Sequence, residues 1–473
     1  MGGHAIVLDI GKTMSKASLW SPKGELLARR TRANLPSAGP GYPALDAAGI
    51  ETWLVEALAE LAPLAPVAAI IPVAHGAGFA VLCDGALALP PMDYELELST
   101  SEMASYRGQR DAFALTGSSA LPAGLNLGAQ LHALQSRHPA AVSPGVTLLP
   151  WVQYWAWRLC GVAASERTSL GCHTDLWYPA ADTFSSLAKA RGWAESFAPL
   201  RQAGECLGTL LPEWAARTGL PETVRVHCGL HDSNAALLAV RAHPQIGDLE
   251  STVLSTGTWF VGLRTPAGPI EPAALPEARD CLVNVDAFGR TVPSARFMGG
   301  REAELLLGED ERLDVPADQP ALLEAVPAVL EAGALPLPAQ VAGCGPYPRG
   351  KGGWPARPLD AVARRAAVGL YLALMVDSML ELIGSSERLV VEGRFAGCEV
   401  LLRTLASLRP DQTVYRAPAE NDVSYGALGL LHPELQPAEP LQQVPAFAPE
   451  WVTALNKART VWRKAAGAGE NIA

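Results

Sequence analysis

The chain has 473 residues, a formal net charge of −11, 49% hydrophobic residues and 18% charged residues. This length predicts two or three domains rather than one core, and the composition is that of a globular protein. The acidic balance, without a run of Lys or Arg, argues against nucleic acid or an anionic membrane as the main partner. ATP remains a possible ligand, because a phosphate site needs only backbone N–H groups and one or two cations.

The N-terminal part predicts an α/β domain. Three short apolar runs between residues 5 and 33, separated by glycine turns, predict an antiparallel meander. A helix is expected over 50–61, and the apolar run 67–74 predicts a buried strand that ends at His75-Gly76. Aromatic residues at helical spacing over 151–159 predict a helix that faces the core.

A second series of the same kind follows. Strand, glycine and polar residues recur at 226–240 and again at 251–263, which indicates a duplicated fold that joins near Cys228–His231. An apolar helix is expected over 370–383, then a strand that enters a glycine loop at 388–397 and a helix over 398–408. The part after about residue 433 is rich in Pro and Ala, and we expect it to pack peripherally.

The eight cysteines form no C-x-x-C pair, so a zinc site or a redox motif has little support. The N-terminus lacks the pattern of a secretory signal. The longest apolar run, 61–74, contains three prolines and is unsuited to span a membrane. We therefore expect a cytoplasmic protein with free thiols.

The stretch LDIGKT, residues 8–13, ends like a P-loop but is not one. A P-loop would need glycine at position 6, where Ile6 stands. The alternative is a hairpin whose tight turn, Gly11-Lys12-Thr13, presents N–H groups, a hydroxyl and an ammonium to phosphates. Asp9 would then hold Mg²⁺ through water. An ordinary hairpin with a solvated lysine explains the same residues.

Two further motifs suggest phosphoryl transfer. STGTW, residues 255–259, could repeat the first hairpin, or it could be an exposed Ser/Thr turn. In GLHDSNAA, residues 229–236, Asp232 could cap a helix or act as the general base that takes a proton from a substrate hydroxyl. Phosphoryl transfer otherwise requires positioning and charge neutralisation.

These motifs, together with VEGRFAG and DVSYGALGLL, occur in an order and spacing that resembles the FGGY family of carbohydrate kinases, closest to its rhamnulokinase and fuculokinase branch. The resemblance covers about residues 5–431. It implies an α/β fold of two actin-like (ribonuclease-H-like) domains with a cleft between them. The expected ranges are 1–230 for the sugar-side domain, 231–440 for the nucleotide-side domain and 441–473 for a peripheral tail.

The resemblance also implies a site. Asp232 would be the catalytic base, Asp9 would hold the metal, and the cofactors would be ATP and Mg²⁺. The residues expected to bind ATP are Gly11, Lys12, Thr13, Thr256, Gly257, Thr258, Gly393, Arg394 and Phe395. The residues expected to contact the sugar are His75, Gly76, Tyr94 and His231, with Asp232 beside them.

The substrate would be a ketose such as L-rhamnulose or L-fuculose, with a pentulose (xylulose or ribulose) or a polyol such as glycerol as the alternative. An actin-like ATPase and a non-catalytic sugar-binding regulator are the readings from other classes. A homodimer is compatible with the family. Three departures from the branch are Gly78 in place of an acidic residue, Arg394 in a glycine position and Cys398 in place of Asn.

Overall fold

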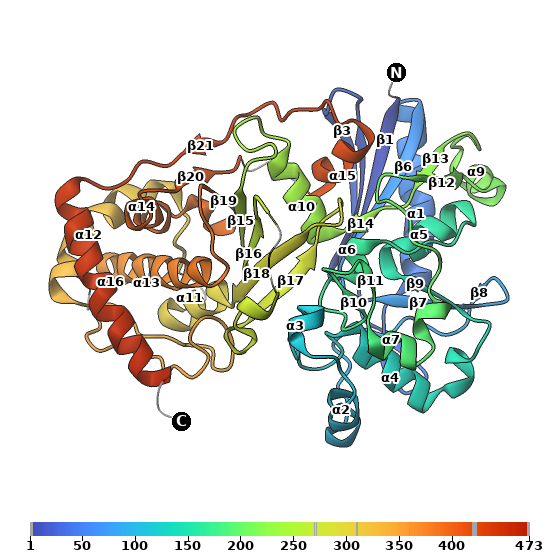
Figure 1. The fold of residues 1–473 in the computed structure, drawn as a ribbon. Coiled ribbons are helices and arrows are strands. Elements are labelled where there is room, and N and C mark those ends of the chain that lie inside the picture. The colour runs from blue at the N-terminus through green and yellow to red at the C-terminus, as the bar shows by residue number, and fades with distance from the viewer. Residues whose placement is uncertain are drawn as a thin grey trace. The chain divides into compact units, whose positions relative to one another are not determined.

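The computed structural model describes residues 3–268, 270, 272–308, 311–358, 360–418 and 423–470. The chain divides into two compact units (Figure 1). Unit 1 comprises 1–242, 283–291 and 422–437, and unit 2 comprises 243–282, 292–421 and 438–473. Each unit is an α/β structure, as predicted.

The main sheet of unit 1 has the strand order β12-β13-β6-β1-β2-β3, with β14 also paired to β6. The predicted meander is confirmed, because β1–β2 and β2–β3 pair antiparallel while β6 pairs parallel to β1. The fully buried run of β1 fits its place between two neighbours. The strands are β1 His4–Ile10, β2 Met14–Trp20, β3 Leu26–Ala33, β6 Val67–Ala74, β12 Cys206–Thr209, β13 Arg225–His227 and β14 Leu230–His231.

Helices and small sheets cover this sheet. Helix α1 begins at the cap Asp46, which accepts the Gly49 N–H, and it buries Ile50, Leu54 and Leu58 at helical spacing. The small strands are β4 Ser37–Gly39, β5 Tyr42–Ala44, β7 Phe79–Cys83, β8 Ala86–Leu87, β9 Thr147–Pro150, β10 Trp177–Tyr178 and β11 Thr183–Phe184. The helices are α1 Ala47–Leu61, α2 Thr100–Arg107, α3 Phe113–Thr116, α4 Leu127–Arg137, α5 Trp151–Cys160, α6 Arg167–Leu170, α7 Ser186–Ala190, α8 Trp193–Ser196, α9 Pro212–Thr218, α10 Asp232–Arg241 and α15 Val423–Leu431.

The predicted aromatic helix is α5, and it faces the core as expected. Trp151, Tyr154 and Trp155 are buried and contact one another, with ring centroids 5.1 to 5.3 Å apart. Such aromatic contacts are favourable beyond the apolar area that they bury. The helix packs against β6, and His75 follows the last residue of that strand.

Unit 2 repeats the plan. Its sheet has the order β17-β18-β16-β15-β19-β20-β21, in which β15 pairs antiparallel with β16 and parallel with β19, as β1 does with β2 and β6. The predicted duplication is therefore confirmed. The strands are β15 Ser251–Thr256, β16 Phe260–Thr265, β17 Cys281–Val285, β18 Thr291–Phe297, β19 Arg388–Gly393, β20 Thr413–Arg416 and β21 Gln442–Gln443. The helices are α11 Gly299–Leu307, α12 Gln319–Ala332, α13 Ala361–Leu382, α14 Glu399–Leu408 and α16 Pro449–Glu470.

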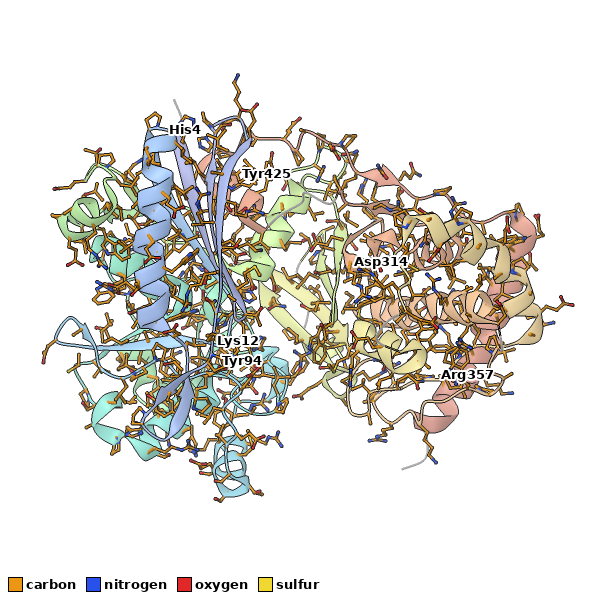
Figure 2. The ribbon with its side chains drawn as sticks, turned by 180° about the vertical axis from the view of Figure 1, so that it is seen from behind. His4, Lys12, Tyr94, Asp314, Arg357 and Tyr425 are labelled. Atoms are coloured by element: carbon orange, nitrogen blue, oxygen red, sulfur yellow. The ribbon has the colours of Figure 1, made fainter. Side chains whose placement is uncertain are left out.

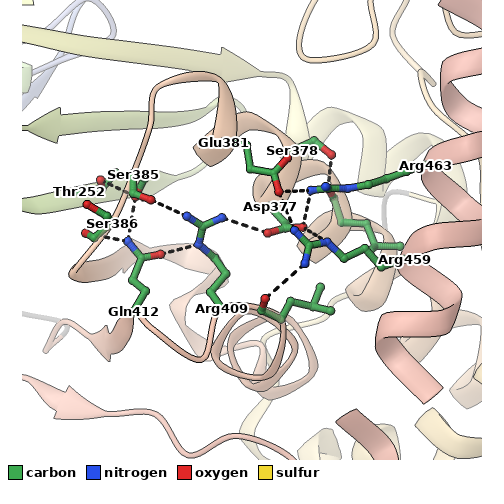
Figure 3. Close-up of polar contacts among 12 residues, drawn as sticks. Thr252, Asp377, Ser378, Glu381, Ser385, Ser386, Arg409, Gln412, Arg459 and Arg463 are labelled. Carbon is green, nitrogen blue, oxygen red and sulfur yellow. Dashed lines mark hydrogen bonds and ion pairs between the residues drawn. The ribbon is translucent and has the colours of Figure 1, made fainter. Parts of the chain in front are cut away.

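The C-terminal helix α16 belongs to the core of unit 2 and is not a peripheral tail. Trp462 is 3% exposed, and its indole N–H donates to the Pro336 carbonyl at 2.7 Å. The fully buried Asp377 of α13 pairs with Arg459 and Arg463 of α16 at 2.8 and 2.7 Å (Figure 3). The proline- and alanine-rich sequence hid this role, because the stripe that fixes the helix is made of residues spread over four turns.

The division into units also differs from the predicted boundaries at 230 and 440. Helix α10, which carries Asp232, lies in unit 1, and so does α15. Gly426 allows α15 to pack closely on α10, because a Cβ there would lie 1.8 Å from the Ala235 carbonyl oxygen of α10. Tyr425 packs edge-on against Trp20, with ring centroids 5.8 Å apart. Asp232 thus shares a unit with the residues predicted on the sugar side.

Candidate active site

Asp232 stands where two parallel strands end. Strand β14 pairs with β6 so that His231 lies opposite Ala74, which places Asp232 and His75 at the same edge of the sheet. Asp232 is the first residue of α10, and its Oδ1 accepts the N–H and the hydroxyl of Ser233 at 2.6 and 3.3 Å. The predicted pairing of Asp232 with the two histidines is therefore built into the strand register.

Burial raises the pKa of the Asp232 carboxyl above its ordinary value, although His75, Ser233 and Lys16 act to lower it. About a third of the side chain, 32%, remains exposed. A carboxylate that is more basic than usual and still accessible suits a general base, whose efficiency increases as its pKa approaches the working pH.

His231 lies beside this carboxylate. Burial lowers the pKa of its imidazole to about 4, so the ring is neutral near pH 7. Its Nε2 lies 3.2 Å from Asp232 Oδ1 and is hydrogen-bonded to the Cys172 sulfur at 3.4 Å. Among the described residues Nδ1 has no hydrogen-bond partner. The His231 N–H donates to Thr168 Oγ1 at 2.9 Å, which fixes the backbone just before Asp232.

His75 and Tyr94 form a wall beside the base. Their rings meet edge to face, with centroids 5.4 Å apart, and burial lowers the pKa of His75. His75 Nδ1 donates to the Gly76 carbonyl at 2.7 Å, which leaves Nε2 as an acceptor. Gly76 has no room for a side chain, since a Cβ would lie 2.9 Å from both Cys172 Sγ and His231 Nε2. The residues predicted on the sugar side are thus brought together.

The first hairpin differs in one respect from the expectation. The Gly11 N–H donates to the Met14 carbonyl at 3.0 Å within the turn, and Asn34 Nδ2 donates to the Gly11 carbonyl at 2.7 Å. The Gly11 N–H is therefore engaged inside the turn and is not presented outward. Thr13 remains exposed, whereas the Lys12 ammonium pairs with Asp93 and lies 3.6 Å from Glu95.

Asp9 is buried, and its carboxylate lies 3.2 Å from the Lys16 ammonium. Within the described residues, no three His, Cys, Asp or Glu side chains gather as a metal cluster. A lone carboxylate suits Mg²⁺, which keeps several waters and takes most of its other ligands from substrate phosphates. The residues therefore fit a magnesium ion that arrives with the nucleotide.

In unit 2 the second hairpin is tied to the glycine loop. Thr256 Oγ1 donates to the Glu392 carbonyl and accepts the Phe395 N–H at 3.0 Å. Gly393 has φ of 80°, and a Cβ there would lie 2.3 Å from the Thr256 carbonyl. The Gly257 N–H is again engaged in the turn, to the Trp259 carbonyl, while Thr258 is exposed. The predicted nucleotide-side residues are thus brought together as well.

Two side chains of the glycine loop act as supports. Phe395 is 1% exposed and packs on Phe260, so its ring is part of the core and cannot lie against a nucleotide. The Arg394 guanidinium lies 3.6 Å from Asp314 and 5.2 Å from the centroid of the Phe395 ring. Cys398, the third departure from the branch, is fully buried before α14.

Sequence reasoning missed several residues around Asp232. Lys16 stabilises its ionised form, Thr168 holds His231, and the Cys172 sulfur lies 3.4 Å from His231 Nε2. The buried Glu166 accepts the Thr168 hydroxyl at 2.5 Å. Lys16 could have been suspected, because a tight turn at 11–13 makes it the cross-strand partner of Asp9. Thr168 and Cys172 carry no sequence signal.

No helix within the described residues is both long and apolar enough to cross a bilayer. The profile described as "Carbohydrate kinase FGGY, C-terminal domain" matches residues 248–439. None of the curated proteins matches the chain.

Solved structures extend the likeness over the whole chain. A carbohydrate kinase from Novosphingobium aromaticivorans is 54% identical, with a TM-score of 0.94 over 98% of this chain and 100% of that one. A xylulose kinase from Rhodospirillum rubrum (18% identity, TM-score 0.79) and a gluconate kinase from Lactobacillus acidophilus (14%, 0.77) share the fold, each over 98% of both chains. The chain belongs to the FGGY family of carbohydrate kinases, with its actin-like fold, and is a sugar kinase.

Proposed function

We propose that this kinase transfers the γ-phosphate of ATP to a hydroxyl of a ketose such as L-rhamnulose or L-fuculose, with Asp232 as the general base. The observation that carries the proposal is the Asp232 carboxylate itself. Burial makes it more basic, Ser233 orients it, His231 Nε2 lies 3.2 Å away, and the strand register places it at one sheet edge with His75. A xylulose-type pentulose or a polyol such as glycerol is the alternative substrate.

In this mechanism the substrate hydroxyl donates to Asp232, which takes the proton as the oxygen attacks the γ-phosphorus. Ser233 holds Asp232 Oδ1 through its N–H and its hydroxyl, so Oδ2 is the oxygen presented to the substrate. His75 Nε2 and the Tyr94 hydroxyl supply further polar contacts on the same side. A bound Mg²⁺, held through Asp9, would neutralise phosphate charge.

Contacts to ATP are assigned to both hairpins and to the glycine loop. Thr13 and Thr258 are the exposed hydroxyls of the two turns, beside Gly11 and Gly257. Thr256, Gly393 and the Phe395 backbone shape the loop that receives the adenosine part, and Arg394 lies at its edge.

The proposal is tested by ADP release in a coupled assay over L-rhamnulose, L-fuculose, D-xylulose, D-ribulose, glycerol and gluconate, with ATP and Mg²⁺. The wild type should turn over at least one neutral ketose or polyol, and Asp232→Ala should lose about a hundredfold or more in kcat. Ser233→Ala is the matched control, because it removes a hydrogen bond to the same oxygen but leaves the base. Absence of turnover on every compound, or an unchanged Asp232→Ala variant, would overturn the proposal.

A further inference from the structure

The neighbours of Lys12 are the residues of the segment 93–95. Its ammonium pairs with Asp93, lies 3.6 Å from Glu95 Oε2 and sits 4.8 Å from the centroid of the Tyr94 ring. Figure 2 shows Lys12 and Tyr94 side by side. One of these three partners, Tyr94, is a residue that the sequence predicts on the sugar side.

The Lys12–Asp93 pair is largely withdrawn from water. The Lys12 side chain is 17% exposed and that of Asp93 is 3% exposed. The second Asp93 oxygen accepts the Glu95 N–H at 2.9 Å, so both oxygens of the carboxylate have partners. A charge pair of this kind is costly to break from one side, because the remaining charge stays buried without compensation.

The pair leads on to the base through aromatic contacts. Tyr94, which lies between Asp93 and Glu95 in sequence, carries the Lys12 ammonium on one face and meets His75 edge to face. His75 is close enough for its titration to respond to Asp232 and to Lys12, with opposite signs. Lys12, Tyr94 and His75 therefore form one continuous wall that ends beside Asp232.

Lys12 and His75 of this wall line a pocket of about 170 Å³ within unit 1. Its polar lining includes Lys12, Asn34, Asp46, His75, Asp93 and Glu95. The volume is below that of typical drug-sized sites and suits one small molecule. Among the described residues that line the pocket, Lys12 is the one Lys or Arg side chain, and it already pairs with Asp93; the lining Asp46 pairs with Arg32.

The second hairpin shows that the fold does not require a lysine in this turn. The residue after its turn glycine is Thr258, a neutral and exposed side chain. If the turn needed an ammonium to grip a phosphate, the same need would apply to both hairpins of the duplicated plan. The role of Lys12 is therefore better explained by its contacts within unit 1 than by the turn itself.

We propose that Lys12 is a positioning residue of the sugar pocket rather than a ligand of the ATP phosphates, and that the pocket takes an uncharged polyhydroxy substrate. Lys12 holds Asp93 and the face of Tyr94, and Tyr94 in turn holds His75 beside the base. A sugar acid would meet Asp46, Asp93 and Glu95 without a cation to spare among the lining residues that the structure describes. This inference rests on the proposed kinase function.

The test separates sugar binding from ATP binding. For the best neutral substrate of the wild type, Lys12→Met and Asp93→Asn should each raise the KM for the sugar about tenfold, as expected when a positioning contact is lost. The KM for ATP, and the Kd of a non-hydrolysable ATP analogue measured by calorimetry, should change less than about twofold. The double variant should be no worse than the poorer single variant, because the two residues act as one unit.

Glu97→Gln is the matched control, since Glu97 is an exposed carboxylate of the same segment that does not line the pocket; its KM for the sugar should stay within about twofold. Gluconate should give less than a tenth of the kcat/KM of the neutral substrate. If Lys12→Met raises the Kd of the ATP analogue and leaves the KM for the sugar unchanged, the role proposed for Lys12 is wrong. If gluconate is used as efficiently as the neutral substrate, the proposed substrate class is wrong. If Lys12→Met does not fold, the same comparison of the KM for the sugar with the Kd of the ATP analogue is made for Asp93→Asn and for Lys12→Arg, which keeps the charge. A wild type without turnover would refute the kinase proposal itself, which is a separate outcome.

Discussion

The two hairpins of the duplicated fold share their strand pairing and turn hydrogen bond but differ in the side chains that follow the turn glycine. Each joins a central strand to its antiparallel neighbour, and each has a glycine whose N–H closes the turn, at 3.0 Å in both. In unit 1 the turn continues with Lys12, which reaches into a carboxylate-rich pocket. In unit 2 it continues with Thr258, and the strand before it is bonded to the glycine loop.

This difference teaches how a duplicated fold divides a reaction. The strand pairing and the closed turn are what the repeated plan requires, so both units keep them. The residues that follow the turn glycine are not needed for the turn itself, and they have diverged. In unit 1, Lys12 lies with Asp93 and His75 at the pocket. In unit 2, the turn lies next to the glycine loop, where Gly393 lets the backbone approach Thr256 closely.

The largest expected effect concerns the unit that carries the acid. Asp232→Asn should lower kcat about a hundredfold or more, with the KM for ATP nearly unchanged, because the amide keeps the size of the side chain but cannot take the proton. Steady-state ADP release measures both constants. A kcat within about threefold of the wild type would remove Asp232 from the chemistry and, with it, the contrast between the two units.

Two acids, the buried Glu166 of unit 1 and the partly buried Glu392 of unit 2, give the next effect. Burial raises the pKa of Glu166 to about 7 and that of Glu392 to about 7. Because each folded-state pKa lies above the unfolded value, the folded chain binds more protons between about pH 4.5 and 7, and each acid lowers stability as pH rises through that window. The loss is on the order of 3 kcal/mol for Glu166, and smaller for Glu392 because its side chain is partly exposed to solvent.

Urea unfolding of the wild type, Glu166→Gln and Glu392→Gln at pH 5, 6, 7 and 8 checks this. Each variant should lose less stability than the wild type as pH rises, and Glu166→Gln should also alter turnover, since Glu166 holds Thr168 and thereby His231. Curves that stay parallel to the wild type across the window would show that neither acid titrates there.

A matched glycine pair tests the frame of the two turns. A Cβ on Gly11 would lie 2.7 Å from the Met14 carbonyl, whereas a Cβ on Gly257 would have its nearest neighbour at 3.9 Å. Gly11→Ala should therefore cost about 1–3 kcal/mol of unfolding free energy, and Gly257→Ala less than about 0.5. Thermal and urea unfolding report both values. Equal costs would mean that the two turns are equally crowded, against the geometry described.

The smallest effect is on pH dependence. The ionised form of Asp232 is disfavoured by burial and favoured by Lys16, so activity should fall as pH drops through the raised pKa of Asp232. Lys16→Met should move this acid limb of log(kcat/KM) to higher pH, because it removes a nearby positive charge. Lys23→Met, in the turn between β2 and β3 and outside the site, is the control. A limb that does not move would show that Lys16 has no influence on the base.

Much of the fold and part of the site followed from the sequence. Alternating and buried runs predicted the meander, its duplication and the aromatic helix α5, because these patterns are local. Motifs at strand ends predict Asp232, His75 and His231 as site residues, and the structure brings the three to one edge of the sheet. The pairing of Lys12 with Asp93, 81 residues away, was missed because a charge in a turn does not reveal its partner. The same holds for Arg394 with Asp314, and for the packing of α16 on α13.

The most direct test of the account compares the residues that follow the two turn glycines. The Kd of a non-hydrolysable ATP analogue is measured by calorimetry for Lys12→Met and Thr258→Val, each against the wild type. The account predicts that Thr258→Val weakens binding about tenfold while Lys12→Met leaves it within about twofold. A tenfold loss in Lys12→Met, with Thr258→Val unchanged, would contradict the assignment of Lys12 to the sugar pocket and of Thr258 to the nucleotide.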